Sequence, residues 1–241
     1  MDDFSRGISF VFRGTGEFFR RPKLWRFVAL PFLAVLAVYA LLYYAALEIW
    51  LPELLNSVRD FFADSWFSFL RRTTEILIKV IFYLFLTALT AFFAGNLFEL
   101  FGGIGFSRMV RCYETEILGC RVEPLPLSRS LRNFAAGAMF SCGTLLWYLF
   151  FFCLSFFLPM IALPGMIFFI GYRYAVVYTS GAVFNSGRRL GEVAALYHGH
   201  RGLLYGFGAM SFLIFLVPLL PIFLVPGMVI GGTLMFHRRD G

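Results

Sequence analysis

Charged side chains are scarce in this chain: Asp, Glu, Lys and Arg make up 15% of its 241 residues, while 60% are hydrophobic and 20% are aromatic. Soluble domains carry about 25% charged residues, so this composition excludes an ordinary soluble fold and indicates a polytopic membrane protein. The net charge of +7 is spread between apolar stretches. No basic stripe of the kind that binds nucleic acid is present, and we expect no nucleic-acid partner.

Residue types that support catalysis or metal binding are also few, with three His and four Cys. The cysteines lack metal-ligand spacing, so we interpret them as packing residues and expect no metal or other cofactor. His198 and His200 could bind a metal or protons, but no acidic or Cys partner is close in sequence, and a solvated pair is favoured. Zinc-protease, nucleophile-elbow, P-loop and dinucleotide motifs are absent, so we predict that the protein is not an enzyme.

The stretch Phe207–Phe236 has no charged side chain and is interrupted by Pro218, Pro221 and Pro226. Each uninterrupted arm has about a dozen residues, fewer than the roughly 20 of a spanning helix. The region between the arms is apolar, whereas a loop in water is normally polar. We therefore predict a re-entrant helical hairpin, whose turn must pack against protein or line a cavity. One kinked spanning helix is the alternative.

A second proline-broken hairpin is predicted over residues 134–181, with its turn at 159–165. Leu163–Met166 resembles Val225–Met228, about 62 positions later, as two copies of one unit would. Half-helices beginning at Gly165 and Gly227 could present backbone amides to an anion, which makes both glycines candidate path-lining residues. The alternative is that the Pro-Gly pairs only shape packing turns.

Two longer apolar segments, 27–50 and 76–101, are predicted to be full transmembrane helices. The first is too long for the apolar core of a signal peptide, so we expect no cleaved leader. Residues 51–75 between them are amphipathic and balanced in charge. Residues 1–20 are predicted to form an interfacial amphipathic helix, because Phe and Val recur at helical spacing; a floppy tail is the alternative.

Lys and Arg are concentrated in residues 1–20, 107–133 and 184–206. Because basic loops stay in the cytoplasm, both termini and these links are predicted to be cytoplasmic and 51–75 periplasmic. The expected fold is therefore one all-α integral membrane domain over 1–241. It would have two long transmembrane helices, two re-entrant hairpins and amphipathic interfacial helices.

The basic segment 20–27 is the leading candidate for an anion site. Pro22 suits the first turn of a helix, and Lys23 and Arg26 stand beside the positive end of that helix. Anchoring to anionic lipid headgroups is the alternative role. Arg173 is a further candidate because it is a cation within an apolar arm, although we expect it to reach the cytoplasmic surface among tyrosines.

A family resemblance rests on stretches that cover most of the chain in order. They are FSRGISFVFRG with RRPKLWRFVALP near the start, GFSRMVRCYETEILG, FFLPMIALPG, and YGFGAMSFLIFLVPLLPIFLVPGMVIGGTLM near the end. In these the chain resembles the CysZ-like family of bacterial inner-membrane proteins, which includes sulfate permeases and etoposide-induced-protein homologues.

The resemblance implies two long spanning helices, two pairs of half-penetrating helices and a homo-oligomer. It also implies sulfate uptake for cysteine biosynthesis. The family binds sulfate at a Gly-Leu-Arg type motif at the start of the first spanning helix, which corresponds here to Lys23, Leu24, Trp25 and Arg26. Leu24 and Arg26 match that motif, whereas Lys23 and Trp25 replace a Gly and an Arg.

The sequence thus predicts an oligomeric inner-membrane transporter or channel for a small oxyanion, with sulfate as the expected substrate and lipids as further partners. The alternative is a non-transporting membrane scaffold that interacts with lipids or assembles with another complex.

Overall fold

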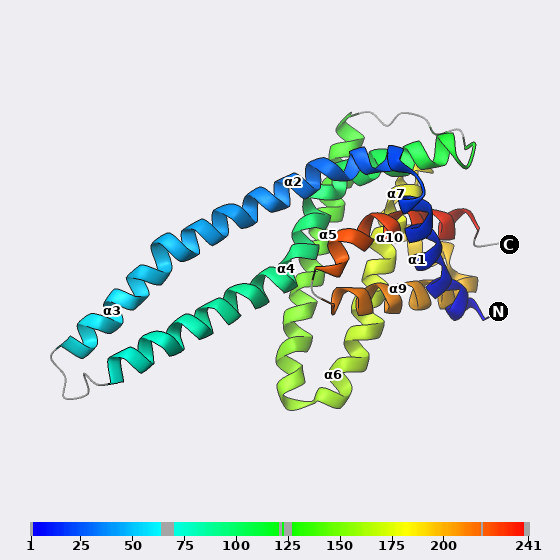
Figure 1. Ribbon diagram of the computed structural model, residues 1–241. Helices are drawn as coiled ribbons and strands as arrows, with labels where there is room; N and C mark the ends of the chain where they lie inside the picture. Colours follow the sequence, from blue (N-terminus) through cyan, green and yellow to red (C-terminus); the bar gives the residue numbers. More distant parts are fainter. Residues whose placement is uncertain (1, 64–69, 121, 123–126, 218, 239–241) are drawn as a thin grey trace.

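The computed structural model describes residues 2–63, 70–120, 122, 127–217 and 219–238, and the elements within these ranges are all helices. The all-α prediction is therefore confirmed. A long two-helix arm projects from a body that holds both chain ends (Figure 1). The α-helices are α1 (Asp3–Phe19), α2 (Pro22–Ala45), α3 (Leu51–Ala63), α4 (Arg71–Glu116), α5 (Leu127–Phe157), α6 (Pro159–Gly165), α7 (Gly171–Asn185), α8 (Val193–Leu196), α9 (Arg201–Phe215) and α10 (Leu220–His237).

The arm consists of α2 and α3 packed beside the first part of α4 (Figure 1). A π-helical segment, Ala46–Trp50, joins α2 to α3. The apolar helix that results runs from Pro22 to Phe61 over 40 residues, or roughly 60 Å at 1.5 Å per residue. It is about twice the 30 Å thickness of the hydrocarbon core. The predicted separate segment 51–75 is therefore the outer end of the arm, and residues 64–69 lie outside the described residues.

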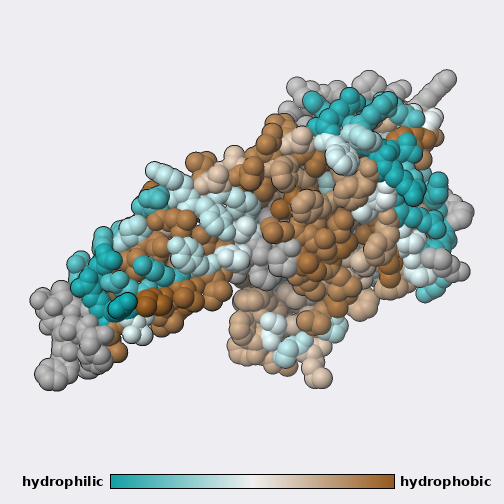
Figure 2. Space-filling model, in the orientation of Figure 1, coloured by the Kyte–Doolittle hydropathy of each residue, from teal (hydrophilic) through white to brown (hydrophobic). Residues whose placement is uncertain are grey.

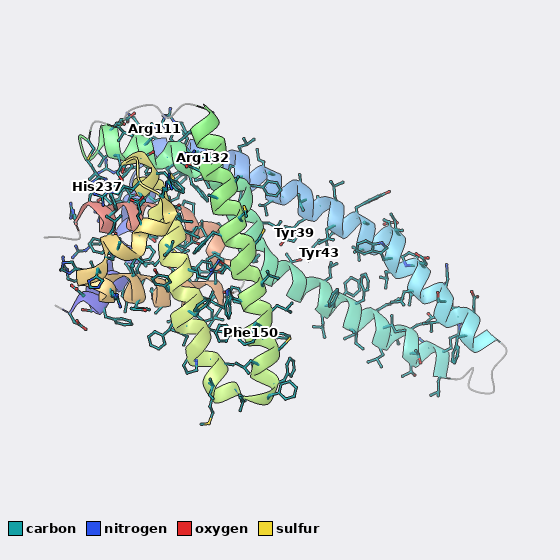
Figure 3. All side chains as sticks on the ribbon, turned by 180° about the vertical axis from the view of Figure 1, so that it is seen from behind. Tyr39, Tyr43, Arg111, Arg132, Phe150 and His237 are labelled. Atoms are coloured by element: carbon teal, nitrogen blue, oxygen red, sulfur yellow. The ribbon has the colours of Figure 1, made fainter. Side chains whose placement is uncertain are left out.

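Two tyrosines of α2 join the arm's helices near its middle (Figure 3). The Tyr39 hydroxyl donates to the Thr90 carbonyl oxygen at 3.2 Å, and the Tyr43 hydroxyl lies 3.1 Å from the Thr90 side-chain oxygen. Many other arm side chains are apolar and exposed, including Leu30 at 75% and Phe85 at 63%. The arm thus offers lipid-compatible surface along both helices.

The second long helix does not end near residue 101 as predicted, because α4 continues through Gly102, Gly103 and Gly105 to Glu116. A glycine inside a helix costs only about 1 kcal/mol relative to alanine, which packing easily offsets. At Gly105 the packing is explicit, since a Cβ there would come within 2.5 Å of the Phe27 carbonyl oxygen. The glycine lets α4 cross α2 closely.

The first hairpin turns at Leu158 and not over 159–165 as predicted. Pro159 occupies the first turn of the returning helix, where its missing amide donor costs nothing. Pro164 is accommodated inside that helix, just before a π-helical segment, Met166–Ile170. The return is helical from Pro159 to Asn185, so the prediction that a half-helix begins at Gly165 is wrong.

The second hairpin consists of α9 and α10, which lie side by side (Figure 1). The chain reverses just before α10, with Leu219 in the left-handed region at φ 64°. The alternative of one kinked helix over this stretch is therefore wrong; Pro218 lies outside the described residues. Pro226 is inside α10, so a half-helix does not begin at Gly227.

Helix α1 is packed into the body against α9 and α10. Its buried face is made of Gly7, Phe10, Val11, Gly14 and Phe18. At Gly7 a Cβ would overlap the α9 backbone, and at Gly14 it would overlap the α10 backbone. Two of the glycines that lower the helix propensity of this segment, Gly7 and Gly14, are thus positions where α1 touches its neighbours.

Candidate functional site

The predicted anion site lies at the start of α2, where that helix meets the last turns of α4. Helix α2 begins with Pro22, and no side chain caps its N-terminus. Pro22 has no amide hydrogen, and the amides of Arg21 and Leu24 donate to the carbonyl oxygens of Phe18 and Arg21 at 3.2 and 3.0 Å. The helix start therefore offers chiefly the positive end of the helix dipole. The elements predicted from sequence to form an anion site are therefore present at one position.

Lys23 and Arg26 are exposed beside this helix start. The Lys23 ammonium, with 80% of its side chain exposed, lies 3.9 Å from a Glu116 carboxylate oxygen. The Arg26 guanidinium lies 4.8 Å from the Phe27 ring centre. Burial is the main cause that raises the pKa of the Cys112 thiol, and the Glu116 carboxylate raises it further. A hydrogen bond from Arg26 partly opposes this rise. The site thus combines two cations with one competing carboxylate.

Leu24 and Trp25 pack near the junction between α1 and α2. Leu24 is 1% exposed, so its side chain belongs to the core. The Trp25 indole donates to the Phe18 carbonyl oxygen at 3.3 Å and stacks on the Phe18 ring. Of the four residues that the resemblance assigns to the site, Lys23 and Arg26 have exposed, charged side chains that can contact an anion.

Arg173 makes its contacts within the first hairpin, and its expected reach toward the cytoplasmic surface stays a prediction. Its guanidinium donates to Thr144 Oγ1 at 2.8 Å and to the Phe140 carbonyl oxygen at 2.6 Å. It also lies 3.9 Å from the Phe140 ring centre. Gly143 makes room for it, because a Cβ there would meet the guanidinium. These contacts give Arg173 a role in joining α7 to α5.

Gly165 and Gly227 are packing positions within helices. Gly165 faces the ring of Phe151, and Gly227 is buried against Thr15 of α1. Their predicted role along an anion path is not tested by these contacts and stays a prediction.

Comparison with known proteins identifies the family of this chain. Residues 10–226 match the family described as sulfate transporter CysZ/etoposide-induced protein 2.4. The chain belongs to this family. No curated protein matches it.

This member of the CysZ family also contains a buried polar cluster that the sequence did not reveal. Glu114 of α4 is 1% exposed. It accepts hydrogen bonds from Asn185 of α7 at 2.6 Å and from the His237 ring of α10 at 2.8 Å. In sequence Glu114 is one of several charges in a polar segment, and its partners are 71 and 123 positions away. Only the tertiary fold brings these residues together.

The histidine pair expected to be solvated is divided between two environments. His198 is exposed, whereas His200 lies 2.9 Å from the Asp3 carboxylate of α1. This acidic partner is 197 positions away, so sequence proximity could not indicate it. Within the described ranges of the chain, no group of three or more His, Cys, Asp or Glu residues could hold a metal.

Proposed function

We propose that this protein is an inner-membrane transporter or channel for a small oxyanion, with sulfate as its substrate for cysteine biosynthesis. The observation that carries the proposal is the pair of exposed cations, Lys23 and Arg26, at the uncapped start of α2. Backbone amides with fixed geometry distinguish a tetrahedral anion from water, while the ammonium and guanidinium groups supply charge. Membership of the CysZ family supports the choice of sulfate.

A membrane-embedded position is supported by the hydropathy of the surface. The visible face is hydrophilic at the end of the body near the chain termini and toward the far end of the arm, with a hydrophobic region between them (Figure 2). Among the residues that the structure describes, four helices are long and apolar enough to cross a membrane, in the ranges Pro22–Phe61, Ala135–Phe157, Pro159–Asn185 and Leu220–His237. The protein is thus a membrane protein, and its basic segments favour cytoplasmic termini.

The proposal keeps the two hairpins as re-entrant elements. Helix α9 has 15 residues, or roughly 22 Å, which is short for a 30 Å hydrocarbon core. The tips of both hairpins are apolar and exposed, with Met160 at 90% and Leu219 at 48%. A tip that stayed within the bilayer or met another subunit would keep such side chains out of water.

A homo-oligomer is part of the proposal. Exposed large hydrophobic side chains extend along the arm and both hairpin tips, and such surface suits contact with a second subunit as well as with lipid. Since Gly227 is closed off by α1 within one chain, we place the anion path between subunits.

Uptake of labelled sulfate into liposomes tests the function. We expect the wild-type protein to take up sulfate and Lys23→Ala/Arg26→Ala to abolish uptake, because the charge at the helix start is removed. The matched control is Arg188→Gln/Arg189→Gln, which removes the same charge from an exposed turn. Normal uptake by the Lys23/Arg26 variant would eliminate this site, and no uptake by the wild type would eliminate the function.

A second candidate, a lipid-interacting or assembly scaffold, is favoured by the large exposed apolar area of the arm. The two candidate functions predict different growth of a strain that lacks the gene. A transporter's deletion strain should grow poorly on limiting sulfate and recover with cysteine, whereas loss of a scaffold should leave both conditions equal.

A further inference from the structure

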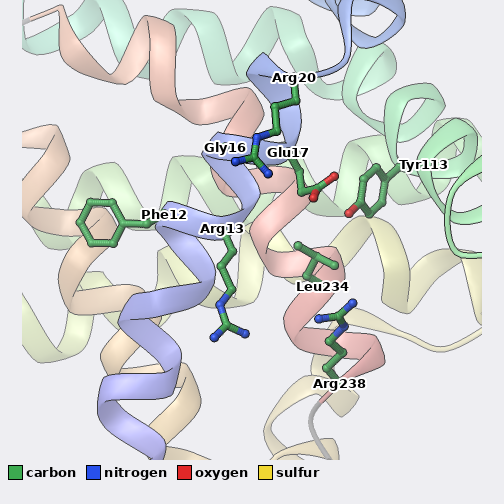
Figure 4. A pocket seen from close by; sticks show the side chains of 8 residues that line it. All are labelled: Phe12, Arg13, Gly16, Glu17, Arg20, Tyr113, Leu234 and Arg238. Carbon is green, nitrogen blue, oxygen red and sulfur yellow. The ribbon is translucent and has the colours of Figure 1, made fainter.

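A pocket of about 370 Å³ lies between the outer side of α1, the end of α10 and the last turns of α4 (Figure 4). It is distinct from the predicted anion site, since neither Lys23 nor Arg26 is among its lining residues. Its volume is within the range of small-ligand sites. The residues that line it are Phe12, Arg13, Gly16, Glu17, Arg20, Tyr113, Leu234 and Arg238.

The pocket carries an excess of positive charge. Arg13, Arg20 and Arg238 bring three guanidinium groups to it from α1 and the end of α10 (Figure 4). Among the described residues, none of the three forms an ion pair within 4.0 Å. The Glu17 carboxylate, which also lines the pocket, accepts a hydrogen bond from Arg21 at 2.9 Å, so three guanidinium groups outnumber one ion-paired carboxylate. Guanidinium groups that line one pocket suit a phosphate group, because each can donate paired hydrogen bonds to phosphate oxygens.

Tyr113 adds a neutral donor at the inner wall. Its side chain is 1% exposed, and Figure 4 shows its hydroxyl turned toward Glu17 and Leu234. Burial raises the pKa of Tyr113 to about 12, with a smaller contribution from Glu17. The hydroxyl therefore stays protonated across the physiological range.

The outer side of α1 also has the pattern of a helix at a membrane surface. At 100° per residue, Phe12 and Phe19 share one edge, and Arg13 and Arg20 share the next. Both phenylalanines are exposed, at 58% and 47%. Aromatic rings beside arginines are typical of helices that place apolar groups at the acyl boundary and cations at the phosphates.

We propose that the pocket formed by Arg13, Arg20 and Arg238 binds a phosphate-bearing anion, from an anionic phospholipid headgroup or a soluble phosphate ester. The site is additional to sulfate transport and does not depend on it. Its occupant would join α1 to the end of α10, and would sit where the hydrophilic end of the body begins.

Native mass spectrometry of the purified full-length protein with phosphatidylglycerol tests the first source. We expect Arg13→Gln/Arg20→Gln to weaken binding at least about tenfold, as loss of charged hydrogen bonds does. The control Arg188→Gln/Arg189→Gln, with an equal change in charge, should stay within about twofold. If the double variant does not fold, the single variant Arg238→Gln, just beyond the end of α10, provides a second test of the loss of lipid binding.

Displacement of the bound lipid by glycerol phosphate tests the second source. Displacement from the wild-type protein would identify a soluble ester, and lipid binding without displacement would identify the headgroup. Equal binding of both probes by the wild type and the two pocket variants would overturn the proposal. Lys23→Ala/Arg26→Ala should keep lipid binding even where sulfate uptake is lost, so the two proposals fail separately.

Discussion

At the scale of single residues, Glu114 is a polar centre on which three helices depend. Replacing it with alanine would leave the buried amide of Asn185 and the His237 ring without their acceptor. We expect Glu114→Ala to lower the free energy of unfolding by about 2 kcal/mol, measured by denaturation in detergent. Glu192→Ala, at an exposed acid, is the control. Equal stability of the two variants would show that the cluster contributes nothing.

Glu116 competes with any anion for Lys23, because its carboxylate lies 3.9 Å from the ammonium nitrogen. We expect Glu116→Gln to tighten sulfate binding severalfold, in line with the 0.2–1 kcal/mol typical of exposed ion pairs. Isothermal titration with sulfate would measure the change. The same substitution in a Lys23→Ala background should have a smaller effect, and an unchanged affinity in both would exclude Glu116 from the site.

The candidate site was predictable from sequence to the extent that it is local. Pro22, Lys23 and Arg26 lie within five residues. Pro22 indicates a helix start, and the two cations follow in its first turns. The pocket of Arg13, Arg20 and Arg238 was not predictable, because its members come together only when α1 packs beside the end of α10. Arg20 was visible as part of a basic cluster, but nothing in the sequence indicated Arg238 as its neighbour.

At the scale of elements, the contact of α1 with α10 depends on glycine. A Cβ at Gly14 would overlap the backbone of Gly227 and Gly231, whereas a Cβ at Gly16, on the same helix, would meet nothing within 4 Å. We expect Gly14→Ala to lower the thermal stability, at a cost of about 1–3 kcal/mol. Gly16→Ala should be neutral or stabilise by up to about 1 kcal/mol. A stable Gly14→Ala variant would contradict the packing.

Apolar composition correctly predicted an all-helical membrane protein, whereas the predicted helix ends at proline and glycine residues were wrong. Pro164 and Pro226 lie inside helices, and α4 passes through three glycines near its middle. In water such residues commonly end helices. Within a packed apolar body, neighbouring helices offset the lost hydrogen bond or the lower propensity, and the backbone continues.

At the scale of the whole molecule, the position of the hairpin tips decides between re-entry and full crossing. We expect cysteines at Met160 and Leu219, in a background with the four native cysteines replaced by serine, to resist an impermeant maleimide added to spheroplasts. A cysteine at Ser57, on the far part of the arm, should react quickly as the control. Fast labelling of Met160→Cys would mean that the first hairpin crosses the membrane completely.

The association of α1 with α9 and α10 has a consequence for biogenesis. These partners lie roughly 180 residues apart along the chain, which corresponds to about 10–40 s of synthesis at 5–20 residues per second. During that interval the buried face of α1 has no final partner, so nascent chains halted before α10 would retain an uncovered, aggregation-prone helix. We therefore expect the body to assemble around α1 only after α9 and α10 have been synthesised.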